Sequence, residues 1–319
     1  MMRRQLPDKG AAFFVVNLAV SVSFVCDGRT LTRKASLSEK GMGMKGILYV
    51  HQEKLKEKGN TSVYEWMEIP EGKTLASVVE EQGLSPGEWL FLAATGEEVQ
   101  MAGRLPMAVG GYRLDDTAEM PWGVPVIFEG VDGMEDLELL RCFQRQHGIP
   151  WVIATTQRCV IRELTLEDLP DLFALYDCPG IAYVEPLYSY EEELEYQKCY
   201  IENMYHCFGF GMWLVFEKES GKLIGRAGLE NRQFCDGVEL ELGYLVHPHW
   251  QRQRIATEVC QAIIAYARDT LECKRLNLLV DKENLPSIRL AEKLGFSFLE
   301  IHEEEGVSRL RYVLHLIRK

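Results

Sequence analysis

The chain has 319 residues, of which 47% are hydrophobic and 26% are charged, and its formal net charge is −13. At about 100–200 residues per domain, this length predicts two globular domains. The acidic balance argues against general nucleic-acid binding, which depends on Lys and Arg to neutralise phosphates. It mildly favours cationic small molecules or basic peptides as partners. The oligomeric state is left open, and a homodimer is one option.

Nine cysteines are scattered along the chain, with no CxxC pair and no His/Cys cluster at zinc-binding spacing. An odd, unpatterned set of this kind fits a reducing compartment, where Cys packs as a small hydrophobe. The sequence therefore predicts a cytoplasmic protein without a bound metal.

Residues 1–44 form an N-terminal segment of unclear role. Its apolar run at 11–26 is shorter than the roughly 20 residues that a membrane span needs, so no membrane association is expected. Two arginines before the run make a weak signal-peptide pattern without a clean cleavage site. Three interpretations stay open: a buried strand pair, a targeting segment, or non-native sequence upstream of a true start at Met42 or Met44.

Residues 46–130 alternate strand and helix patterns, carried by the segments ILYVH, LASVVEEQG, EWLFLAAT, GEEVQMAGR, LPMAVGGY and VPVIFEG. Strand–helix alternation predicts a largely parallel sheet with right-handed crossovers. An amphipathic helix over 134–147 follows, and the Gly and Pro of GIPW at 148–151 then resist continuation of the helix. We therefore expect a smaller α/β domain at 45–147 and a second domain at 148–319.

The second domain is expected to contain a mixed sheet with flanking helices, in the order β-α-α-β-β-β-α-β-α-β-β. Thr165 caps the first helix with Asp168 three positions on, a variant of the capping box. The segment 212–231 has the pattern of a hairpin whose turn is ESGK. Asn284 opens the last helix, which stops at Gly295.

The stretch HPHWQRQRIATEV at 247–259 links a strand to an amphipathic helix. A strand that feeds a helix through a tight loop points several backbone N–H groups at one spot, and the helix dipole adds partial positive charge there. Such a nest binds phosphate without a net positive protein. Residues 251–256 occupy that position, with Arg252 and Arg254 adding charge. The alternative is an ordinary junction with solvated arginines.

The run ELGYLVHPHWQRQRIATE at 241–258 resembles motif A of the GNAT acetyltransferases, whose strand 4, loop and helix 3 hold the pyrophosphate of acetyl-CoA. The family's loop has the pattern Q/R-x-x-G-x-G/A, and Gln251, Ala256 and the following Thr257-Glu258 match it. The resemblance covers residues 158–317 and is closest to the branch that includes ribosomal-protein N-terminal acetyltransferases. It implies that acetyl-CoA is bound by the loop and the helix start, which comprise Gln251, Arg252, Gln253, Arg254, Ile255, Ala256 and Thr257.

One departure from the family pattern is Arg254, which stands in place of the first loop glycine. A glycine there permits close approach of the backbone to the pyrophosphate and a positive φ. Arginine either weakens this cradle or turns its guanidinium toward the phosphates as compensation.

The segment ENLPSIRLAEKLGF at 283–296 resembles a second family segment, N-x-x-S-x-x-x-x-x-x-L-G-F. Many members protonate the CoA thiolate with a tyrosine, but Ala291 stands at that position here. The resemblance implies that Ser287 takes this role and that Asn284 binds the pantetheine amide. The structural alternatives are that Ser287 satisfies backbone groups at the helix start and that Asn284 is the helix N-cap.

Period-2 alternation places Glu239, Glu241, Gly243, Leu245 and His247 on one face of the preceding strand. Acetyl transfer needs a neutral amine, although amines are protonated near pH 7, so a carboxylate must remove that proton directly or through water. Glu241 matches the family's strand-4 glutamate and is the candidate base, with Glu239 as the substitute. Two like charges there could raise one pKa toward neutrality. The alternative is that Glu241 is a surface carboxylate on a half-buried strand.

The resemblance also implies contacts to the rest of the cofactor and to the acceptor. Backbone groups of Leu245 and Val246 are expected to bind the pantetheine arm where strands 4 and 5 splay apart, and Gly243 could accommodate the bulge on which the splay depends. The acceptor pocket is expected to be lined by Trp213, Glu230, Asn231 and Glu239, with a core role for Trp213 as the alternative.

The run EWLFLAATGEEVQMAGRLPMAVGGY at 88–112 resembles the strand–helix–strand near the end of haloacid-dehalogenase-like hydrolases. There a strand ends in an aspartate that helps to hold Mg²⁺, but Ala94 stands at that place here and no D-x-D-x-T motif occurs. Mg²⁺ needs carboxylate oxygens. We therefore expect a degenerate accessory domain without phosphatase activity, which docks a partner or shapes the acceptor site.

The predicted function is acetyl-CoA-dependent transfer of an acetyl group directly to an amine of a small molecule or a protein N-terminus. Acetyl-CoA is the cosubstrate, no metal takes part, and proximity of the bound reactants supplies much of the rate. The alternative is a non-catalytic acyl-CoA-binding regulatory protein, motivated by Arg254 and the missing tyrosine. A two-domain phosphatase is a third interpretation, which requires Mg²⁺-dependent activity on a phosphoester.

Overall fold

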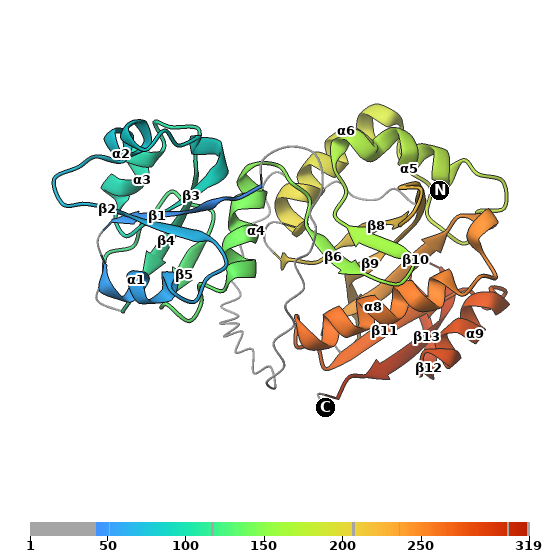
Figure 1. The fold of residues 1–319 in the computed structure, drawn as a ribbon. Coiled ribbons are helices and arrows are strands. Elements are labelled where there is room, and N and C mark those ends of the chain that lie inside the picture. Colours follow the sequence, from blue (N-terminus) through green and yellow to red (C-terminus); the bar gives the residue numbers. More distant parts are fainter. Residues whose placement is uncertain are drawn as a thin grey trace. The chain divides into compact units, whose positions relative to one another are not determined.

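The computed structural model describes residues 43–50, 52–115, 118–205, 208–235, 237–304 and 306–317. These residues divide into two compact units, one that ends at Ile149 and one that begins at Pro150 (Figure 1). The three interpretations of the N-terminal segment concern residues that lie almost entirely outside the described ranges. Among the helices in these ranges, none has both the length and the apolar character that a membrane crossing requires.

The first unit is built on five parallel strands in the order β2-β1-β3-β4-β5. The largely parallel sheet predicted for this region is therefore confirmed. Its central strand β3 is buried at every position, as expected of a parallel strand with both faces covered. The strands are β1 (Gly46–Val50), β2 (Glu65–Ile69), β3 (Trp89–Ala93), β4 (Ala108–Arg113) and β5 (Ile127–Glu129).

Helices cover both faces of this sheet. Leu90 and Leu92 of β3 share a hydrophobic cluster with α1 and α4, whereas Phe91 shares another with α2 and α3. Because successive side chains of a strand point to opposite faces, the two helix pairs lie on opposite sides of the sheet. The helices are α1 (Glu53–Gly59), α2 (Leu75–Glu81), α3 (Gly96–Ala102) and α4 (Asp136–Gln146).

The sequence pattern did not reveal α1 and β2. Helix α1 is short and charged and buries only Leu55, and β2 is an edge strand in which only Ile69 is buried. A short surface helix and an edge strand need few apolar residues, so their periodicity is weak.

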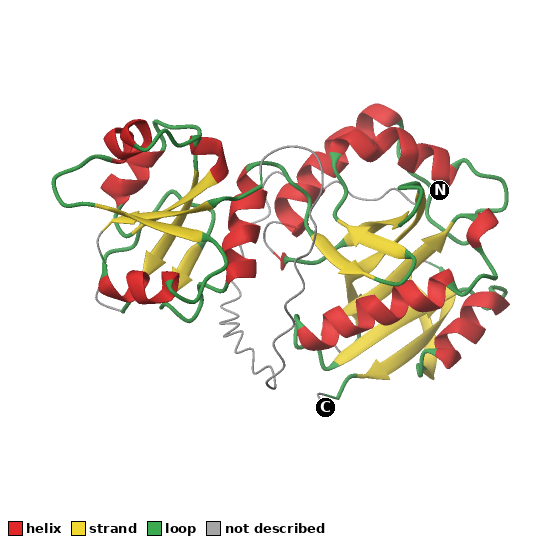
Figure 2. Cartoon of the chain, in the orientation of Figure 1, coloured by secondary structure: helices red, strands yellow, loops and turns green. Residues whose placement is uncertain are grey.

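The second unit contains an eight-stranded mixed sheet in the order β12-β13-β11-β10-β9-β8-β7-β6 (Figure 2). Neighbouring strands are antiparallel except β10 and β11, which are parallel. The predicted mixed sheet and element order are confirmed, and the edge strand β6 precedes them. The strands are β6 (Val152–Thr155), β7 (Cys159–Arg162), β8 (Met212–Glu217), β9 (Leu223–Phe234), β10 (Gly237–Val246), β11 (Arg275–Val280), β12 (Ser297–Glu304) and β13 (Val307–His315).

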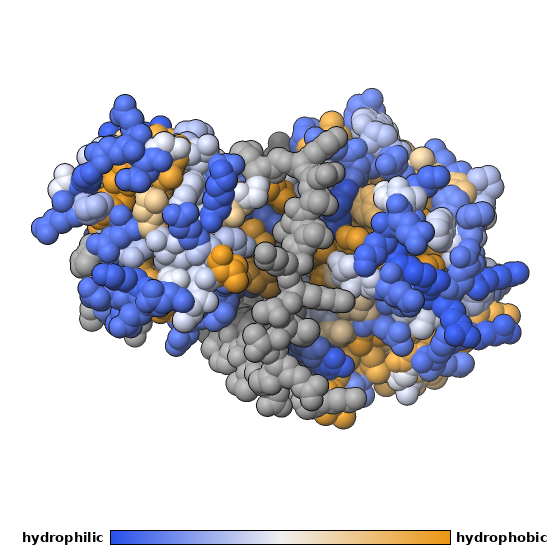
Figure 3. Space-filling view, in the orientation of Figure 1, coloured by the Kyte–Doolittle hydropathy of each residue, from blue (hydrophilic) through white to orange (hydrophobic). Residues whose placement is uncertain are grey.

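Helices α5 and α6 cover one face of this sheet, and α8 and α9 cover the other (Figure 1). Their side chains join one large hydrophobic cluster with the strands. Figure 3 shows hydrophilic residues, in blue, over most of the visible surface of each unit, as expected when apolar side chains are concentrated in the cores. The helices are α5 (Leu169–Tyr176), α6 (Tyr190–Tyr200), α8 (Ile255–Asp269) and α9 (Leu285–Lys293).

Two predicted helix starts are confirmed in the second unit. Asp168 accepts hydrogen bonds from the N–H and the hydroxyl of Thr165 at 2.7 and 2.9 Å, which closes the predicted capping box. Asn284 caps α9, because its Oδ1 accepts a hydrogen bond from the N–H of Ser287 at 3.3 Å. Such caps satisfy backbone donors that have no helical partner.

Candidate active site

Strands β10 and β11 meet at one register position and then separate. Strand β10 is paired with β9 from Gly237 to Val246, but with β11 only at Glu241 and Asn277. Strand β11 continues to Val280 without further pairing to β10. The described sheet is therefore open on the β11 side of β10 beyond Glu241.

The backbone of Val246 faces this opening. The N–H of His247 donates to the carbonyl of Ile224 on β9 at 2.8 Å, and backbone groups along a strand alternate in direction. Leu245 therefore points its N–H and C=O toward β9, whereas Val246 points them toward the β11 side. There the Val246 carbonyl accepts a hydrogen bond from Nε2 of Gln251 at 3.0 Å. Of the two residues expected to bind the pantetheine arm, only Val246 has its backbone in the opening.

The opening forms without a bulge in β10. The pairing of β9 and β10 shows no register shift. The prediction of a bulge at Gly243 is therefore wrong. A Cβ on Gly243 would lie 3.2 Å from Sδ of Met212, so the glycine instead permits close packing against β8.

A buried polar cluster, which we call the branch cluster, holds the strands together where the opening begins. Glu239 Oε2 accepts hydrogen bonds from Nε of Arg275 at 2.6 Å and from Nδ2 of Asn277 at 2.7 Å. Asn277 in turn accepts one from Nε of Arg311 on β13 at 2.9 Å, and both Asn277 and Arg311 are buried. The cluster satisfies the Glu239 carboxylate, which favours a structural role for this residue.

Glu241 lies next to this cluster and carries a perturbed pKa. Its Oε2 accepts a hydrogen bond from Nε of Arg232 on β9 at 2.7 Å, and Glu230 stands directly opposite on the same strand. Burial raises the pKa of Glu241, Arg232 opposes the rise, Glu230 adds to it, and the pKa is raised overall. A carboxylate with a raised pKa is a stronger base than an ordinary glutamate.

The loop between β10 and α8 contains two residues in the left-handed conformation. Arg252 has φ 59° and Arg254 has φ 65°, which costs a non-glycine residue roughly 1–2 kcal/mol. Arg254 therefore adopts the conformation that the family's glycine would supply. Left-handed residues within a turn help its N–H groups converge into an anion-binding nest, so the arginine retains the backbone path expected of this loop.

The first turn of α8 presents amides that form no bonds within the helix. The first backbone hydrogen bond of the helix runs from the N–H of Glu258 to the carbonyl of Arg254 at 3.1 Å. The N–H groups of Ile255, Ala256 and Thr257 precede it and have no helical acceptor. Arg254, at the N-cap position, provides no side-chain cap. The helix start can therefore receive an anion, which the helix dipole also favours.

Arg158, at the start of β7, ties this loop to the sheet. Its Nη1 donates to the carbonyl of Gln253 at 3.0 Å, and its backbone N–H and Nε donate to the carboxylate of Glu258 at 2.8 and 2.9 Å. Burial acts to raise the pKa of Glu258, but hydrogen bonds from Thr156 and Arg158 lower it overall. Sequence reasoning missed Arg158, because nothing in its local pattern indicates a partner 100 residues away.

Ser287 lies at the start of α9, beside Tyr244 of β10. Burial raises the pKa of the Tyr244 phenol, and the nearby Ser287 hydroxyl opposes part of that rise. The Tyr244 oxygen forms no hydrogen bond of normal geometry within the described residues, so the Ser287 hydroxyl is a neighbour of the phenol and not its hydrogen-bond partner. Tyr244 and Glu241 point to opposite faces of β10 because they are three residues apart.

Two of the residues expected to line the acceptor pocket do not share the strand face of Glu241. Trp213 is fully buried and packs edge-to-face on Tyr266 of α8, with ring centroids 5.3 Å apart, so it is a core residue. Asn231 is exposed and is adjacent to Glu230, so its side chain points away from the face that carries Glu241. Glu230 alone among these candidates shares that face without belonging to the branch cluster.

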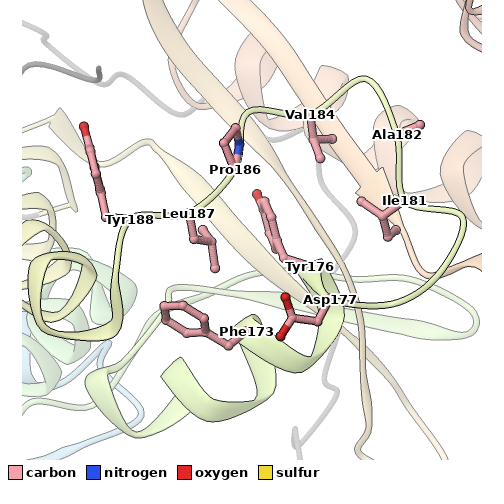
Figure 4. A pocket seen from close by; sticks show the side chains of 9 residues that line it. All are labelled: Phe173, Tyr176, Asp177, Ile181, Ala182, Val184, Pro186, Leu187 and Tyr188. Carbon is pink, nitrogen blue, oxygen red and sulfur yellow. The ribbon is translucent and has the colours of Figure 1, made fainter. Parts of the chain in front are cut away.

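A groove of about 370 Å³ lies between α5 and the segment that leads to α6 (Figure 4). We call it the α5–α6 groove. Sequence reasoning missed it, because its walls come from a loop without periodicity. It is lined by Phe173, Tyr176, Asp177, Ile181, Ala182, Val184, Pro186, Leu187 and Tyr188.

In the first unit, side chains of the chain itself accept hydrogen bonds from N–H groups at the junction between β3 and α3. The N–H of Ala94, after β3, donates to Oε2 of Glu98 at 2.6 Å, and Thr95 Oγ1 accepts a hydrogen bond from the N–H of Glu98 at 3.3 Å. Within the described ranges, no group of three or more His, Cys, Asp or Glu side chains is arranged to hold a metal ion.

Comparisons with known proteins locate the family resemblance in the second unit. Residues 158–297 match the family model of the acetyltransferase (GNAT) domain. The uncharacterized N-acetyltransferase YoaA of Bacillus subtilis (strain 168) is 25% identical over 160 residues, which are 49% of this chain and 86% of YoaA. The uncharacterized protein YkkB of the same organism is 28% identical over 92 residues, 28% of this chain, and the match spans about half of YkkB (53%).

Among solved structures, the acetyltransferase of Agrobacterium tumefaciens str. C58 is 24% identical and covers 51% of this chain and 93% of its own, with a TM-score of 0.42. The family model leaves the ribosomal-protein branch and the haloacid-dehalogenase resemblance of the first unit as predictions. The C-terminal half of the chain contains a GNAT acetyltransferase domain.

Proposed function

We propose that the protein is an acetyl-CoA-dependent N-acetyltransferase that moves the acetyl group directly to an amine. The opening between β10 and β11, which leads to the uncapped start of α8, is the observation that carries this proposal. An extended ligand arm can pair with a free strand edge, and its anionic end can then reach the helix amides.

The loop and the helix start are proposed to hold the diphosphate of acetyl-CoA. Amides from Gln253 to Thr257 would donate to the phosphates, with Arg252 and Arg254 adding positive charge. The backbone of Val246 would bind the pantetheine arm, and Asn284 its amide. When bound, acetyl-CoA supplies an activated thioester carbonyl.

Glu241 is proposed to accept the proton of the acceptor ammonium, directly or through one water. Its raised pKa suits this role. Glu230, opposite Glu241, adds negative charge that attracts the cationic amine before transfer. Ser287 is proposed to protonate the CoA thiolate as it leaves.

The scheme draws only on side chains and backbone groups of the second unit and uses no metal. The described cysteines are free, which supports a reducing, cytoplasmic setting. A protein N-terminus, as the resemblance to the ribosomal-protein branch implies, and a small-molecule amine both remain within the proposal.

The proposal is tested in two steps with the full chain. Isothermal titration with acetyl-CoA should show one site, and replacing Ala256 with Asp, which puts a carboxylate beside the helix amides, should weaken it. An amine panel with a thiol readout for released CoA should then show turnover. Binding without turnover across polyamines, amino acids, antibiotics and N-terminal peptides would instead support the non-catalytic alternative.

A further inference from the structure

We propose that Arg232 is a positioning residue for the base Glu241, and that Glu304 on the edge strand β12 is the second partner that makes this possible. Arg232 holds one carboxylate oxygen of Glu241 while the other oxygen receives the proton of the acceptor ammonium. Glu304 keeps the guanidinium paired after that transfer. This inference rests on the proposed function and adds two residues to the same site.

Arg232 is divided between two carboxylates. Its Nε donates to Oε2 of Glu241 at 2.7 Å, and its Nη1 donates to Oε2 of Glu304 at 2.9 Å. The side chains of Arg232 and Glu241 are 23% and 13% exposed, whereas that of Glu304 is 36% exposed. The contact with Glu241 is therefore shielded from water, and the contact with Glu304 reaches the surface. Because both acids share one guanidinium, a change of charge at one carboxylate affects the other.

Only one oxygen of Glu241 is held. Among the residues that the structure describes, the donor to Glu241 is Arg232, and its hydrogen bond goes to Oε2. An ionised carboxylate has two accepting oxygens, so Oε1 is available to an acceptor ammonium while Oε2 stays on the arginine. Proton transfer needs the base within hydrogen-bond reach of the proton. The fixed Oε2 therefore orients Glu241 for its role.

Glu304 matters at the moment when Glu241 becomes neutral. A buried guanidinium that loses its counter-charge is strongly unfavourable, so an isolated pair of Arg232 and Glu241 would resist protonation of the acid. Glu304 supplies a second negative charge, and Arg232 remains in an ion pair. The proton that leaves the ammonium nitrogen goes to Oε1 of Glu241, and the lone pair left on the amine is free to attack the thioester carbonyl.

Packed side chains hold the end of β12 next to the end of β9. The rings of Phe234 and His302 meet edge-to-face with centroids 5.2 Å apart. Phe234 lies two residues after Arg232 on β9, and Glu304 lies two residues after His302 on β12, so each pair shares a strand face. The position of Glu304 beside Arg232 is therefore set by packing as well as by charge.

The charges around the base act in both directions. Burial is the largest influence and raises the pKa of Glu241, Arg232 and Arg309 of β13 lower it, Glu230 of β9 raises it, and the pKa is raised overall. Burial acts to lower the pKa of Arg232, but Glu241, Glu304 and Glu230 raise it overall, so the guanidinium stays charged. The other charged or titratable side chains around these residues are Tyr200, Glu239, Arg275, Glu300, His302 and Arg311.

The experiment measures kcat/KM against pH at saturating acetyl-CoA, with spermidine and with a peptide that has a free N-terminus as acceptors. Arg232→Gln should move the midpoint of the rise in kcat/KM to higher pH by about one unit, because it removes the positive charge beside Glu241. It should also lower kcat on the plateau about tenfold, because Glu241 is no longer oriented. Glu304→Gln should move the midpoint to lower pH by roughly half a unit, because Arg232 then pairs with Glu241 alone.

Two further variants separate this role from a structural one. Arg232→Lys keeps the charge, so its midpoint should stay close to that of the unsubstituted chain while kcat on the plateau recovers in part. Arg162→Gln is the matched control, because Arg162 and its partner Asp168 are 23% and 11% exposed and are as well shielded as the pair of Arg232 and Glu241. It should leave the midpoint unchanged.

The outcomes distinguish the inference from the proposed function. Midpoints that do not move in Arg232→Gln and Glu304→Gln, or that move in the same direction, would overturn the inference. A rise that disappears in His302→Gln would also overturn it, because the titrating group would then be that imidazole. In these cases the proposed function stands if Glu241→Gln still loses kcat. Failure of the unsubstituted chain to bind acetyl-CoA, or to acetylate any amine, would overturn both.

Discussion

At the end of β3, side chains accept hydrogen bonds from the N–H groups of Ala94 and Glu98 around the start of α3, whereas at the end of β10 the start of α8 has no side-chain cap. Both junctions join a strand to a helix with an acidic residue in its first turn, Glu98 in α3 and Glu258 in α8. Glu98 turns back and accepts a hydrogen bond from the N–H of Ala94. Glu258 is instead bound by Arg158.

The contrast shows that topology alone does not make an anion site. A carboxylate near a helix start competes with any incoming anion, because both accept from the same N–H groups and both are favoured by the dipole. In the second unit, Arg158 removes that competitor and leaves the amides available. In the first unit no such arginine holds Glu98 in the described structure, and the junction is closed.

The largest expected effect is a loss of kcat when a carboxylate of the second unit is replaced, with no loss for a carboxylate of the first unit. Replacing Glu241 with Gln should lower kcat by about 10²–10⁴-fold, because it removes the proposed base, and should leave the Kd of acetyl-CoA unchanged. Arg232 keeps a partner in Glu304 at 2.9 Å, so the variant should fold. Glu98→Gln in the first unit is the control and should leave kcat unchanged. Full activity in the Glu241 variant would remove this residue from the mechanism.

The dependence of kcat/KM on pH is a second test of Glu241 as the base. Because burial raises the folded pKa of Glu241, its protonated form persists to higher pH than in an ordinary glutamate, near 4.3. The kcat/KM should fall about tenfold per pH unit below that raised pKa and level off above it. The rising limb should be absent in Glu241→Gln, and a limb that persists there must belong to another group.

Closing the open junction should weaken cofactor binding. Arg254→Asp places a carboxylate beside the free amides of α8 and also removes a positive charge. We expect the Kd of acetyl-CoA to rise about 30-fold, equivalent to roughly 2 kcal/mol. Thr95→Asp at the corresponding position of α3 should have no effect on that Kd. An unchanged Kd in Arg254→Asp would place the diphosphate elsewhere.

Releasing Glu258 should have a smaller effect on the same equilibrium. Arg158→Gln frees the carboxylate of Glu258 to approach the amides and loosens Gln253. The Kd of acetyl-CoA should rise about tenfold, and the double variant Arg158→Gln with Glu258→Gln should recover part of it. The matched control is Arg113→Gln, which breaks the Arg113–Glu129 pair of the first unit. If the double variant recovers nothing, Glu258 is not the competing group.

The smallest effect concerns stability alone. Burial acts to raise the pKa of Asp168, but hydrogen bonds from Arg162 and Thr165 lower it overall. Its contribution is therefore present above the unfolded pKa of about 3.9 and is lost as the pH falls through the folded pKa. Asp168→Asn should lower the free energy of unfolding by about 1–2 kcal/mol at pH 7. Denaturation curves should converge in acid, and a constant difference would exclude this ionisation as the cause.

The sequence predicted most of the second unit because its signals are local. Alternation along β10 placed Glu239 and Glu241 on one face, and the Thr165 and Asn284 caps were visible as short patterns. The features that the sequence left open depend on neighbours in space. Arg275 on β11 donates a hydrogen bond to Glu239 and Arg311 on β13 forms an ion pair with it, and packing against α8 buries Trp213.

The residues that sequence reasoning missed share this property. Arg158, Arg232 and the walls of the α5–α6 groove act through contacts between elements that are far apart in the chain. For Asn231 a local pattern was sufficient, since its neighbour Glu230 occupies the face toward Glu241. The period-2 alternation of side chains along β9 would have placed Glu230 and Asn231 on opposite faces of the strand.

The branch cluster has a further consequence for how such proteins can diverge. It lies at the paired residues Glu241 and Asn277, where β10 and β11 are hydrogen-bonded before they separate. This pair is the rung that sets where the apex of the wedge-shaped opening between the two strands lies. Sliding that rung by two residues would keep every side chain on its own face and move the apex by about 6.6 Å. A relative could in this way adjust how deeply an acyl chain enters the wedge while keeping the same loop for its phosphates.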